Sequence, residues 1–396
     1  MNSSILSEGF LCKMKNNIYL DYAATSPVLP EVLDEMIPFF TDNYGNPSGV
    51  YSTAREAQQA VEKARKQTAE TLGSEPSEIY FTSGGSESDN MAIMGTARAL
   101  ASKGRHIITS GIEHHAVLNP CRYLEKEGWQ ITYLPVNHQG IIDPEDVRRA
   151  IRPDTVLISV MAANNEIGTL EPIHEIGKIA RESSVLFHTD AVQAIGAVPL
   201  SVQEIGCDLL SISAHKFYGP KGVGALYIRK GTRIDSLILG GAQERGLRAG
   251  TENTAGIIGL GKAIRIAAQE MKTNADRNRQ MRDRLIRQIL KNIPGSSING
   301  SIEKRLDNNC HVSFTGIDGE ALLLRLDLAG IAASGGSACT SGSREPSHVL
   351  QAIGLDEDRM NGSIRFTVGR NTTAEQIDQA ARKTTEIVAD LRKMAY

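Results

Sequence analysis

The sequence has no marked excess of either charge: its 396 residues include 43 Lys and Arg against 46 Asp and Glu, a net charge of −3. It therefore offers no broad positive field for a polyanion, and we do not expect nucleic acid to be a partner. No apolar run approaches the roughly 20 residues that cross a bilayer. Residues 1–13 also lack the apolar core of a signal peptide.

The five cysteines include no C-x-x-C pair, which argues against a zinc knuckle or a dithiol redox motif. We therefore predict no metal site. Their odd number indicates a reducing compartment. Together with the missing membrane span, it predicts a cytoplasmic protein with no membrane partner.

Short runs rich in Ile and Val alternate with helical patterns from residue 28 to 255, among them "EIYFTSG", "RHIITSG", "TVLISVMAAN", "VLFHTDA" and "CDLLSISAHK". Runs that are apolar on both faces and separated by helices predict an α/β fold with a mainly parallel sheet. Ligands of such sheets bind beyond the carboxyl ends of the strands. Polar residues follow several of the runs: Ser83, Glu113, Asn165, Asp190 and His215.

The pattern becomes helical for some forty residues from Asn253 to about Ile293, and a final amphipathic helix is predicted over Ala374–Met394. Shorter elements between them predict a small α+β domain. The expected organisation is an N-terminal extension (1–16, expected to be disordered), a large domain (28–255), and a small domain that includes the long connecting helix (17–27 and 256–396).

Lys216 directly follows an apolar strand in "DLLSISAHKFYGPKG". A lysine with its usual pKa of roughly 10.4 is a poor nucleophile at neutral pH, so amine chemistry requires it to be desolvated or bound as an imine. Pyridoxal phosphate forms such an imine, and needs a carboxylate at its ring nitrogen, a phosphate cradle and a stacking group. A solvated strand end is the alternative interpretation of Lys216.

Asp190 ends the run "VLFHTD", where a buried carboxylate requires a cation such as a protonated pyridine. A helix N-cap explains it equally well. In "FTSGGSESDN", Gly84, Gly85 and Ser86 join a strand to a helix, which leaves backbone N–H groups free for a phosphate. Alone, this stretch is as easily an ordinary turn.

Two other stretches of the sequence resemble phosphate-binding motifs but lack a residue that each motif requires. "GIIGLGKA" has the spacing of a P-loop, but Ala263 replaces the Ser or Thr that would hold magnesium, and no strand precedes it. "GVGALY" lacks the third glycine of a dinucleotide fingerprint. Neither ATP nor NAD is therefore indicated.

Cys339 lies among small residues in "ASGGSACTSGSREPS". A structural free cysteine is usually buried among apolar side chains. The composition therefore favours a mobile, reactive thiol, with an ordinary surface loop as the alternative.

Ten motifs occur in an order typical of one family, between about Asn17 and the C-terminus: "YLDYAATSP", "GNPSG", "FTSGGSESDN", "EHHAVL", "NNEIGT", "HTDAVQAIG", "SAHKFYGPKGVGALY", "ERGLRAGTEN", "GGSACTSG" and "SIRFTVGR". With them the chain resembles the cysteine desulfurases of the class V aminotransferase superfamily. It is most similar to group I, the nitrogen-fixation and iron–sulfur-cluster assembly type, whose catalytic cysteine lies in a longer loop.

The resemblance implies a pyridoxal phosphate enzyme of fold type I. The implied catalytic residues are Lys216, which binds the cofactor covalently, Cys339, and His114, which stacks on the ring. The implied cofactor ligands are Lys216, Asp190, Gln193, Gly85, Ser86, Ser213, His215, Asn165 and, from the other subunit of a homodimer, Thr251. The implied substrate ligands are Arg365, Asn46 and Asn165.

Two of these roles have alternatives in the sequence. His114 could simply cap a strand. Arg365 alternates with Ile364 and Phe366, so it could be an exposed strand residue, and Arg370 is a rival for the same role.

The resemblance implies conversion of L-cysteine to L-alanine. Lys216 would remove the α-proton, and the Cys339 thiolate would take the sulfur as a persulfide and pass it to an acceptor protein such as an iron–sulfur scaffold. The alternatives are a selenocysteine lyase, another class V β-lyase or aminotransferase, and a non-catalytic, cofactor-binding sulfur carrier. Gly336 replaces a usual Ser, the first thirteen residues have no counterpart, and the chain lacks a longer C-terminal tail, so the acceptor stays open.

Overall fold

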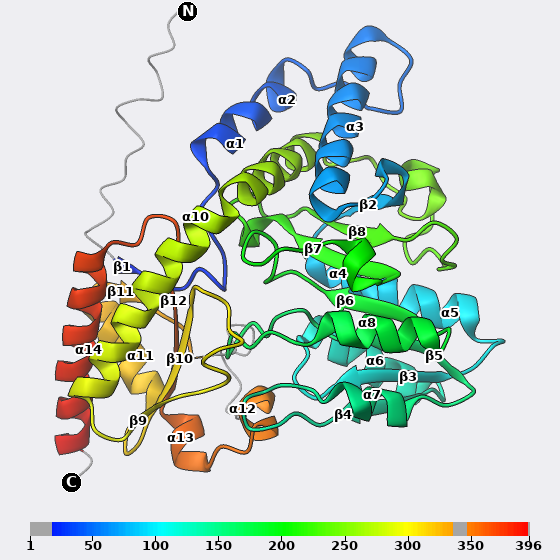
Figure 1. Ribbon diagram of the computed structural model, residues 1–396. Helices are drawn as coiled ribbons and strands as arrows, with labels where there is room; N and C mark the ends of the chain where they lie inside the picture. Colours follow the sequence, from blue (N-terminus) through cyan, green and yellow to red (C-terminus); the bar gives the residue numbers. More distant parts are fainter. Residues whose placement is uncertain (1–17, 336–346, 395–396) are drawn as a thin grey trace, which may run out of the picture.

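A seven-stranded sheet forms the centre of the larger part of the molecule (Figure 1). The structure, a computed structural model, describes residues 18–335 and 347–394. The strands are β2 (Ile79–Thr82), β3 (His106–Ser110), β4 (Gln130–Leu134), β5 (Thr155–Ser159), β6 (Leu186–Asp190), β7 (Leu209–Ser213) and β8 (Gly224–Ile228). Their order is β2-β8-β7-β6-β5-β3-β4. Of the seven strands, only β8 runs opposite to the other six, so the predicted mainly parallel sheet is confirmed.

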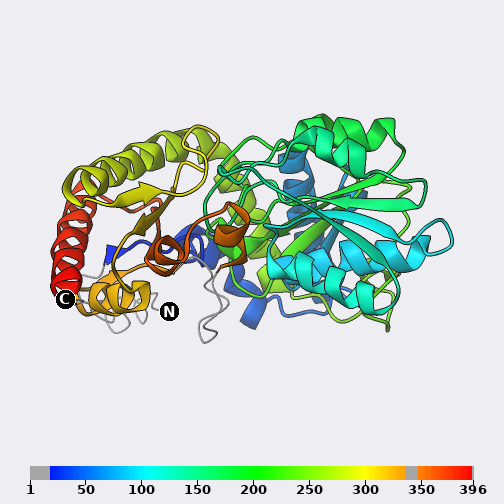
Figure 2. The same ribbon diagram turned by 90° about the horizontal axis from the view of Figure 1, so that it is seen from below.

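Helices cover both faces of this sheet. The central strands are therefore buried along their whole length. Figure 2 shows green helices on one side of the strands and cyan helices on the other. The helices of this part are α1 (Pro30–Met36), α2 (Pro38–Thr41), α3 (Ser52–Leu72), α4 (Gly85–Asn90), the π-helical η2 (Met91–Gly95), α5 (Thr96–Leu100), α6 (His115–Lys126), α7 (Pro144–Ala150), α8 (Ile173–Glu182) and α9 (Val202–Ile205). Three short 3₁₀ turns join them: η1 (Pro76–Glu78), η3 (Ala214–Lys216) and η4 (Gln243–Gly246).

The smaller part contains a three-stranded antiparallel sheet of β9 (Ser296–Ile298), β10 (Asn309–Phe314) and β12 (Ser363–Thr367). A second, parallel pair joins β1 (Ile18–Tyr19) to β11 (Ile331–Ala332), so the N-terminal strand belongs to this part. Its helices are α11 (Gly319–Leu328), α12 (His348–Ala352), α13 (Glu357–Asn361) and α14 (Ala374–Met394). The predicted final helix therefore has the predicted bounds.

The long helix α10 (Thr254–Asn292) links the two parts and matches the predicted helical stretch. Its first half buries Leu260 and Ile264 in the core of the larger part. Its second half buries Leu285 and Ile289 in the core of the smaller part, next to α14. Sequence-based boundaries placed all of α10 after residue 255 in the small domain, whereas its side chains divide between the two cores.

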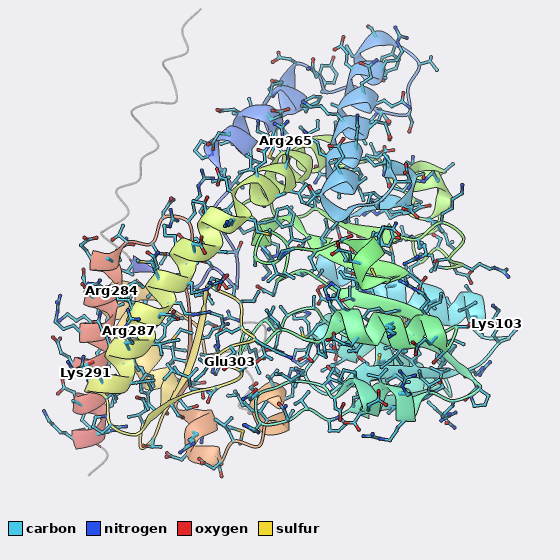
Figure 3. The ribbon with its side chains drawn as sticks, in the orientation of Figure 1. Lys103, Arg265, Arg284, Arg287, Lys291 and Glu303 are labelled. Carbon is cyan, nitrogen blue, oxygen red and sulfur yellow. The ribbon has the colours of Figure 1, made fainter. Side chains whose placement is uncertain are left out.

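Exposed cations lie along the second half of α10 beside α14, as Figure 3 shows for Arg284, Arg287 and Lys291. Arg284 donates to both oxygens of Asp378 on α14 at 2.6 Å, which ties the two helices together.

Within the described residues, no helix is both long and apolar enough to cross a membrane.

Candidate active site

Lys216 lies in the first turn after β7, at the carboxyl end of the parallel strands. Its Nζ donates to the backbone oxygens of Ala23 (2.6 Å) and Ala24 (2.8 Å). These carbonyls belong to the segment that crosses from β1 to the larger part. Lys216 is therefore not a solvated strand end, because backbone of a distant segment holds its amine.

Asp190 is the last residue of β6, next to β7 in the sheet, and is 6% exposed. Its Oδ1 accepts a hydrogen bond from the Val192 amide at 2.9 Å. Burial raises the pKa of Asp190 to about 6, although the Val192 amide and the charge of Lys216 oppose this shift. Gln193, in the turn that follows, donates from Nε2 to the Ala23 oxygen at 3.0 Å. Lys216 and Gln193 thus converge on one carbonyl.

Beside Asp190 lie the buried residues Asp89, His188 and Glu113, which we call the floor of the site. The sequence analysis missed two of them, Asp89 and His188. The His188 imidazole is fully buried between the hydroxyls of Ser159 (2.8 Å) and Ser211 (3.0 Å). Burial lowers its pKa to about 3, so the ring is neutral. The Asp89 carboxylate lies 3.6 Å from His188 Nε2, and burial, followed by the nearby charge of Asp190, raises its pKa well above the ordinary value.

Glu113 is a second buried acid beside the site. Its Oε1 accepts from the Ser110 hydroxyl (2.6 Å) and the Met161 amide (3.0 Å). Burial nevertheless raises its pKa to about 8. With His188 neutral and both Asp89 and Glu113 favoured in their protonated forms, the floor carries little charge of its own, and it supplies no cation for Asp190.

His114 is the N-cap of α6, where its Nδ1 accepts a hydrogen bond from the Ala116 amide at 3.1 Å. The alternative interpretation of His114 was that it caps a strand. In the structure it caps a helix instead. Burial, then the positive charge of Lys216, lowers the pKa of His114 to about 4. The ring is therefore neutral, and because Nδ1 accepts, its proton lies on Nε2.

The predicted phosphate cradle lies where β2 meets α4. Gly85 and Ser86 begin α4, and Ser213 at the end of β7 faces them: a Cβ built on Gly85 would lie 3.5 Å from the Ser213 Cβ. The same added Cβ would come within 2.7 Å of Val192 Cγ2, so only glycine fits without a shift. His215 shares a hydrogen bond of 3.2 Å with the Thr25 hydroxyl. Burial lowers the pKa of His215 to about 4.

Arg365 lies on β12 with only 2% of its side chain exposed, so it is not an exposed strand residue. Its Nη1 donates to the backbone oxygen of Asn165 at 2.8 Å, and its Nη2 to Asp21 Oδ1 at 2.9 Å. The structure therefore brings together Arg365 and Asn165, two of the three predicted substrate ligands.

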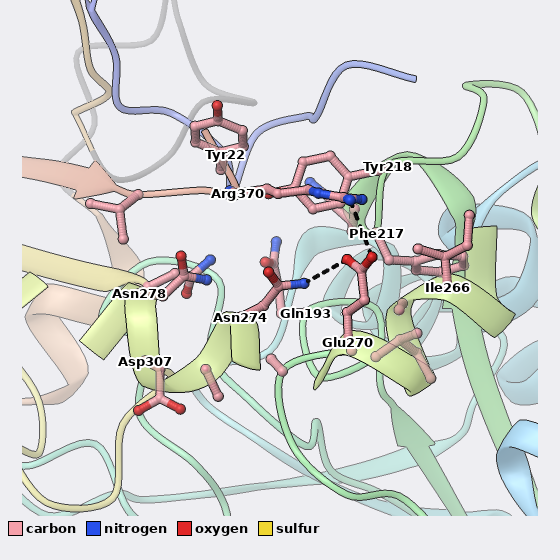
Figure 4. Close-up of a pocket in the computed structure, with 18 of the residues that line it drawn as sticks. Tyr22, Gln193, Phe217, Tyr218, Ile266, Glu270, Asn274, Asn278, Asp307 and Arg370 are labelled. Atoms are coloured by element: carbon pink, nitrogen blue, oxygen red, sulfur yellow. Dashed lines mark hydrogen bonds and ion pairs between the residues drawn. The ribbon is translucent and has the colours of Figure 1, made fainter. Parts of the chain in front are cut away.

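The rival residue Arg370 lines a cavity between α10 and the Lys216 loop, and Lys216 and Gln193 line the same cavity (Figure 4). It forms an ion pair of 3.1 Å with Glu270, which also accepts from Asn274. Its backbone amide donates to the Tyr218 hydroxyl at 2.7 Å. The charge of Arg370 is thus partnered by a carboxylate of α10, which makes it the weaker candidate for a substrate carboxylate.

Three predicted residues are not placed at this site within one chain. Asn46 is exposed, and its Oδ1 accepts from the Ser48 amide of its own turn. That turn, between α2 and α3, lies far from β12 in Figure 1. Thr251 is exposed in the segment before α10. Cys339 lies outside the described residues, as does the predicted extension over residues 1–16.

The family described as Aminotransferase class-V matches residues 18–380. A protein from Dictyoglomus turgidum named cysteine desulfurase IscS is 55% identical over 382 residues, which cover 96% of this chain and 97% of the relative. A mouse protein named cysteine desulfurase is 48% identical over 381 residues, 96% of this chain and 83% of the relative.

Two solved structures are also similar to this chain over most of its length. A structure titled NifS-like protein has a TM-score of 0.90 and 40% identity, and the match covers 95% of this chain and all of that one. A structure titled SspA in complex with cysteine has a TM-score of 0.80 and 39% identity, covering 90% of this chain and all of that one.

The chain therefore belongs to the class-V aminotransferase family. Within this class it is a cysteine desulfurase enzyme with the α/β architecture of its NifS-like relatives. The resemblance noted from the ten sequence motifs is confirmed, and so is the predicted fold.

Proposed function

We propose that the chain binds pyridoxal phosphate at Lys216 and uses Cys339 to take the sulfur of L-cysteine as a persulfide, releasing L-alanine. The single observation that carries the proposal is the convergence of Lys216 and Gln193 on the Ala23 carbonyl, near the buried Asp190. When bound, the cofactor supplies an electron sink that lets an amino acid lose its α-proton.

The described residues fit this cofactor. Asp190 is a buried carboxylate on an almost uncharged floor, which suits a protonated ring nitrogen on its open side. The neutral His114 ring would stack on the cofactor, and Gln193 would bind the ring oxygen together with Asn165. The phosphate would be held by Gly85, Ser86, Ser213 and His215.

The protein residues divide the chemistry of the substrate between them. Arg365 binds the carboxylate, with a guanidinium that suits two parallel hydrogen bonds. Lys216 accepts the α-proton, with His114 as the nearby acid/base group. The Cys339 thiolate attacks the substrate sulfur; an S–S bond forms as the C–S bond breaks, and protonation of the three-carbon fragment gives L-alanine.

The active unit is a homodimer in which the exposed Thr251 binds the phosphate in the other subunit's site. An acceptor protein, such as an iron–sulfur scaffold, collects the sulfur. The location is the cytoplasm.

The proposal is tested by steady-state formation of alanine and sulfide from L-cysteine with a thiol reductant. The wild-type protein should give one alanine per sulfide, and Cys339→Ser should give neither. Cys12→Ser, which removes a different cysteine, should match the wild type. Alanine formation at the full rate by Cys339→Ser would instead favour a lyase that needs no loop cysteine.

A further inference from the structure

No side chain of the motif "YLDYAATSP" has a role in the proposed function, yet its residues contact several residues of the site. We call Asp21–Ser26 the crossing segment, because it runs from the small part to the Lys216 loop. Its contacts at the Lys216 end are the Ala23 and Ala24 oxygens with Lys216, the Ala23 oxygen with Gln193, the Thr25 hydroxyl with His215, and the Ser26 hydroxyl with the His215 oxygen and the Tyr218 amide.

The other end of the crossing segment is fixed on β12. The Tyr22 amide donates to the Thr367 oxygen, and the Ala23 amide to the Thr367 hydroxyl at 2.9 Å. The Thr367 amide in turn donates to the Leu20 oxygen at 2.7 Å. These bonds flank Asp21 on both sides, so its backbone is held two residues along β12 from Arg365.

The Asp21 carboxylate reaches Arg365 from this fixed backbone. Its Oδ1 accepts from Nη2 at 2.9 Å, while the Asn165 oxygen accepts from Nη1 at 2.8 Å. The two acceptors come from segments that are far apart in the sequence, one before β2 and one after β5. Together they determine which way the plane of the guanidinium faces.

The surroundings of Arg365 make a nearby anion necessary. The guanidinium is 2% exposed, and a buried cation is unfavourable unless it is paired. His311, opposite it on β10, is fully buried, and burial lowers its pKa to about 3, so it brings no charge. The nearby carboxyl of Glu166 accepts a hydrogen bond of 2.5 Å from the Ser347 hydroxyl. Among the described residues, Asp21 is the carboxylate in an ion pair with Arg365.

We propose that Asp21 is a positioning residue that orients the Arg365 guanidinium for the substrate carboxylate. Asp21 does not touch the reacting atoms; it acts through Arg365. A carboxylate needs both donors of one guanidinium edge at once, so a small rotation of the guanidinium plane would remove one of the two bonds. This inference rests on the proposed role of Arg365 as the substrate carboxylate ligand.

The test replaces Asp21 with asparagine in the cofactor-loaded enzyme. The Asn oxygen can still accept from Nη2, so the fold should be kept, but the charge that holds the guanidinium is lost. We expect the KM for L-cysteine to rise about 10- to 100-fold, because a hydrogen bond to a charged group contributes this much. The value of kcat should stay within about threefold, since the reacting groups are untouched.

A second readout does not depend on turnover. The dissociation constant of the product L-alanine, which carries the same carboxylate but no sulfur, should rise by a similar factor in Asp21→Asn. The visible absorption of the bound cofactor should be unchanged. Asp378→Asn is the matched control, because it removes the carboxylate partner of Arg284 in the same part of the molecule, and it should leave both constants as in the wild type.

Failure of the two proposals can be told apart. If Arg365→Lys leaves the KM unchanged, the proposed substrate ligand is wrong. If Arg365→Lys raises the KM and Asp21→Asn does not, the positioning role is wrong. A fall in KM would also overturn it, since it would mean that Asp21 competes with the substrate.

Two further variants complete the test. Asp21→Asn combined with Arg365→Lys should be no worse than Arg365→Lys alone, and additive losses would refute action through Arg365. Should Asp21→Asn fail to fold, Asp21→Glu keeps the charge but displaces it by one methylene. It should raise the KM as well, and a wild-type KM would refute the positioning role.

Discussion

Replacing Asp190 with asparagine should stabilise the cofactor-free protein near neutral pH while weakening its binding of the cofactor. Asp190 is buried, and burial raises its pKa from an ordinary value of 3.8 to about 6. Asparagine has nearly the same shape, and its Oδ1 can keep the 2.9 Å hydrogen bond from the Val192 amide. The substitution therefore removes the ionisable group with little change in packing.

The direction of the pKa shift determines whether Asp190 stabilises or destabilises the fold as the pH rises. A folded-state pKa above the unfolded value means that the contribution of Asp190 to stability is complete below about pH 4 and is lost as the pH rises through 6. The difference between 3.8 and about 6 corresponds to roughly 3 kcal/mol at about 1.4 kcal/mol per pH unit. Roughly half of it should be lost between about pH 5 and pH 8.

The assay is urea unfolding of cofactor-free wild type and Asp190→Asn at pH 5, 6.5 and 8. The variant should gain about 1.5 kcal/mol relative to wild type across this range. Asp327→Asn, at an exposed position, should show no such trend. A variant that is equally or less stable at pH 8 would refute the buried-carboxylate reasoning. Cofactor affinity should fall in the same variant, because the ring nitrogen loses its anion.

Three other outcomes are expected. Lys216→Ala should abolish alanine formation and the visible absorption of the covalently bound cofactor, and a retained band would contradict its role. Arg65→Ala should lower the free energy of unfolding by about 3–5 kcal/mol, because it leaves Glu244 buried without the cation that now donates to both its oxygens. An equal number of inactive Lys216→Ala and Thr251→Ala subunits, mixed before dimerisation, should form one intact site per mixed dimer.

The Arg65→Ala prediction has a matched control, and the mixed-subunit prediction has a result that would contradict it. Arg148→Ala, which removes an ion pair about half exposed on both sides, should change stability by less than about 1 kcal/mol. A similar loss in both Arg variants would contradict the importance of burial. No recovered activity in the mixture of Lys216→Ala and Thr251→Ala would argue against a phosphate ligand shared between subunits.

The sequence predicted the elements best where one physical signal dominated. The runs ending at Thr82, Asp190 and Ser213 are strands, and nearly all of their residues are buried, as expected in a sheet that is covered on both faces. The helices α10 and α14 were predicted from a long 3.6-residue periodicity, and their ends match within one residue. The division of α10 between two cores was not predicted, since periodicity gives a buried face but not its partner.

The candidate site was predictable where residues sit at strand ends, because parallel strands bring their carboxyl ends to one edge of the sheet. Asp190 and Lys216 lie there. Asp89 and His188 were missed because their partners are side chains on other elements, although the alternation in "FHTD" already placed His188 on the face of Asp190. The link from Asp21 to Arg365 spans 344 residues, and no local pattern could indicate it.

The most direct test of the account is a single turnover of L-cysteine without reductant or acceptor, followed by mass spectrometry of the peptide that contains Cys339. The account predicts one alanine released and one extra sulfur on Cys339 per active site, with neither in Cys339→Ser. Alanine released at the wild-type rate by Cys339→Ser, or the extra sulfur found on another cysteine, would contradict it.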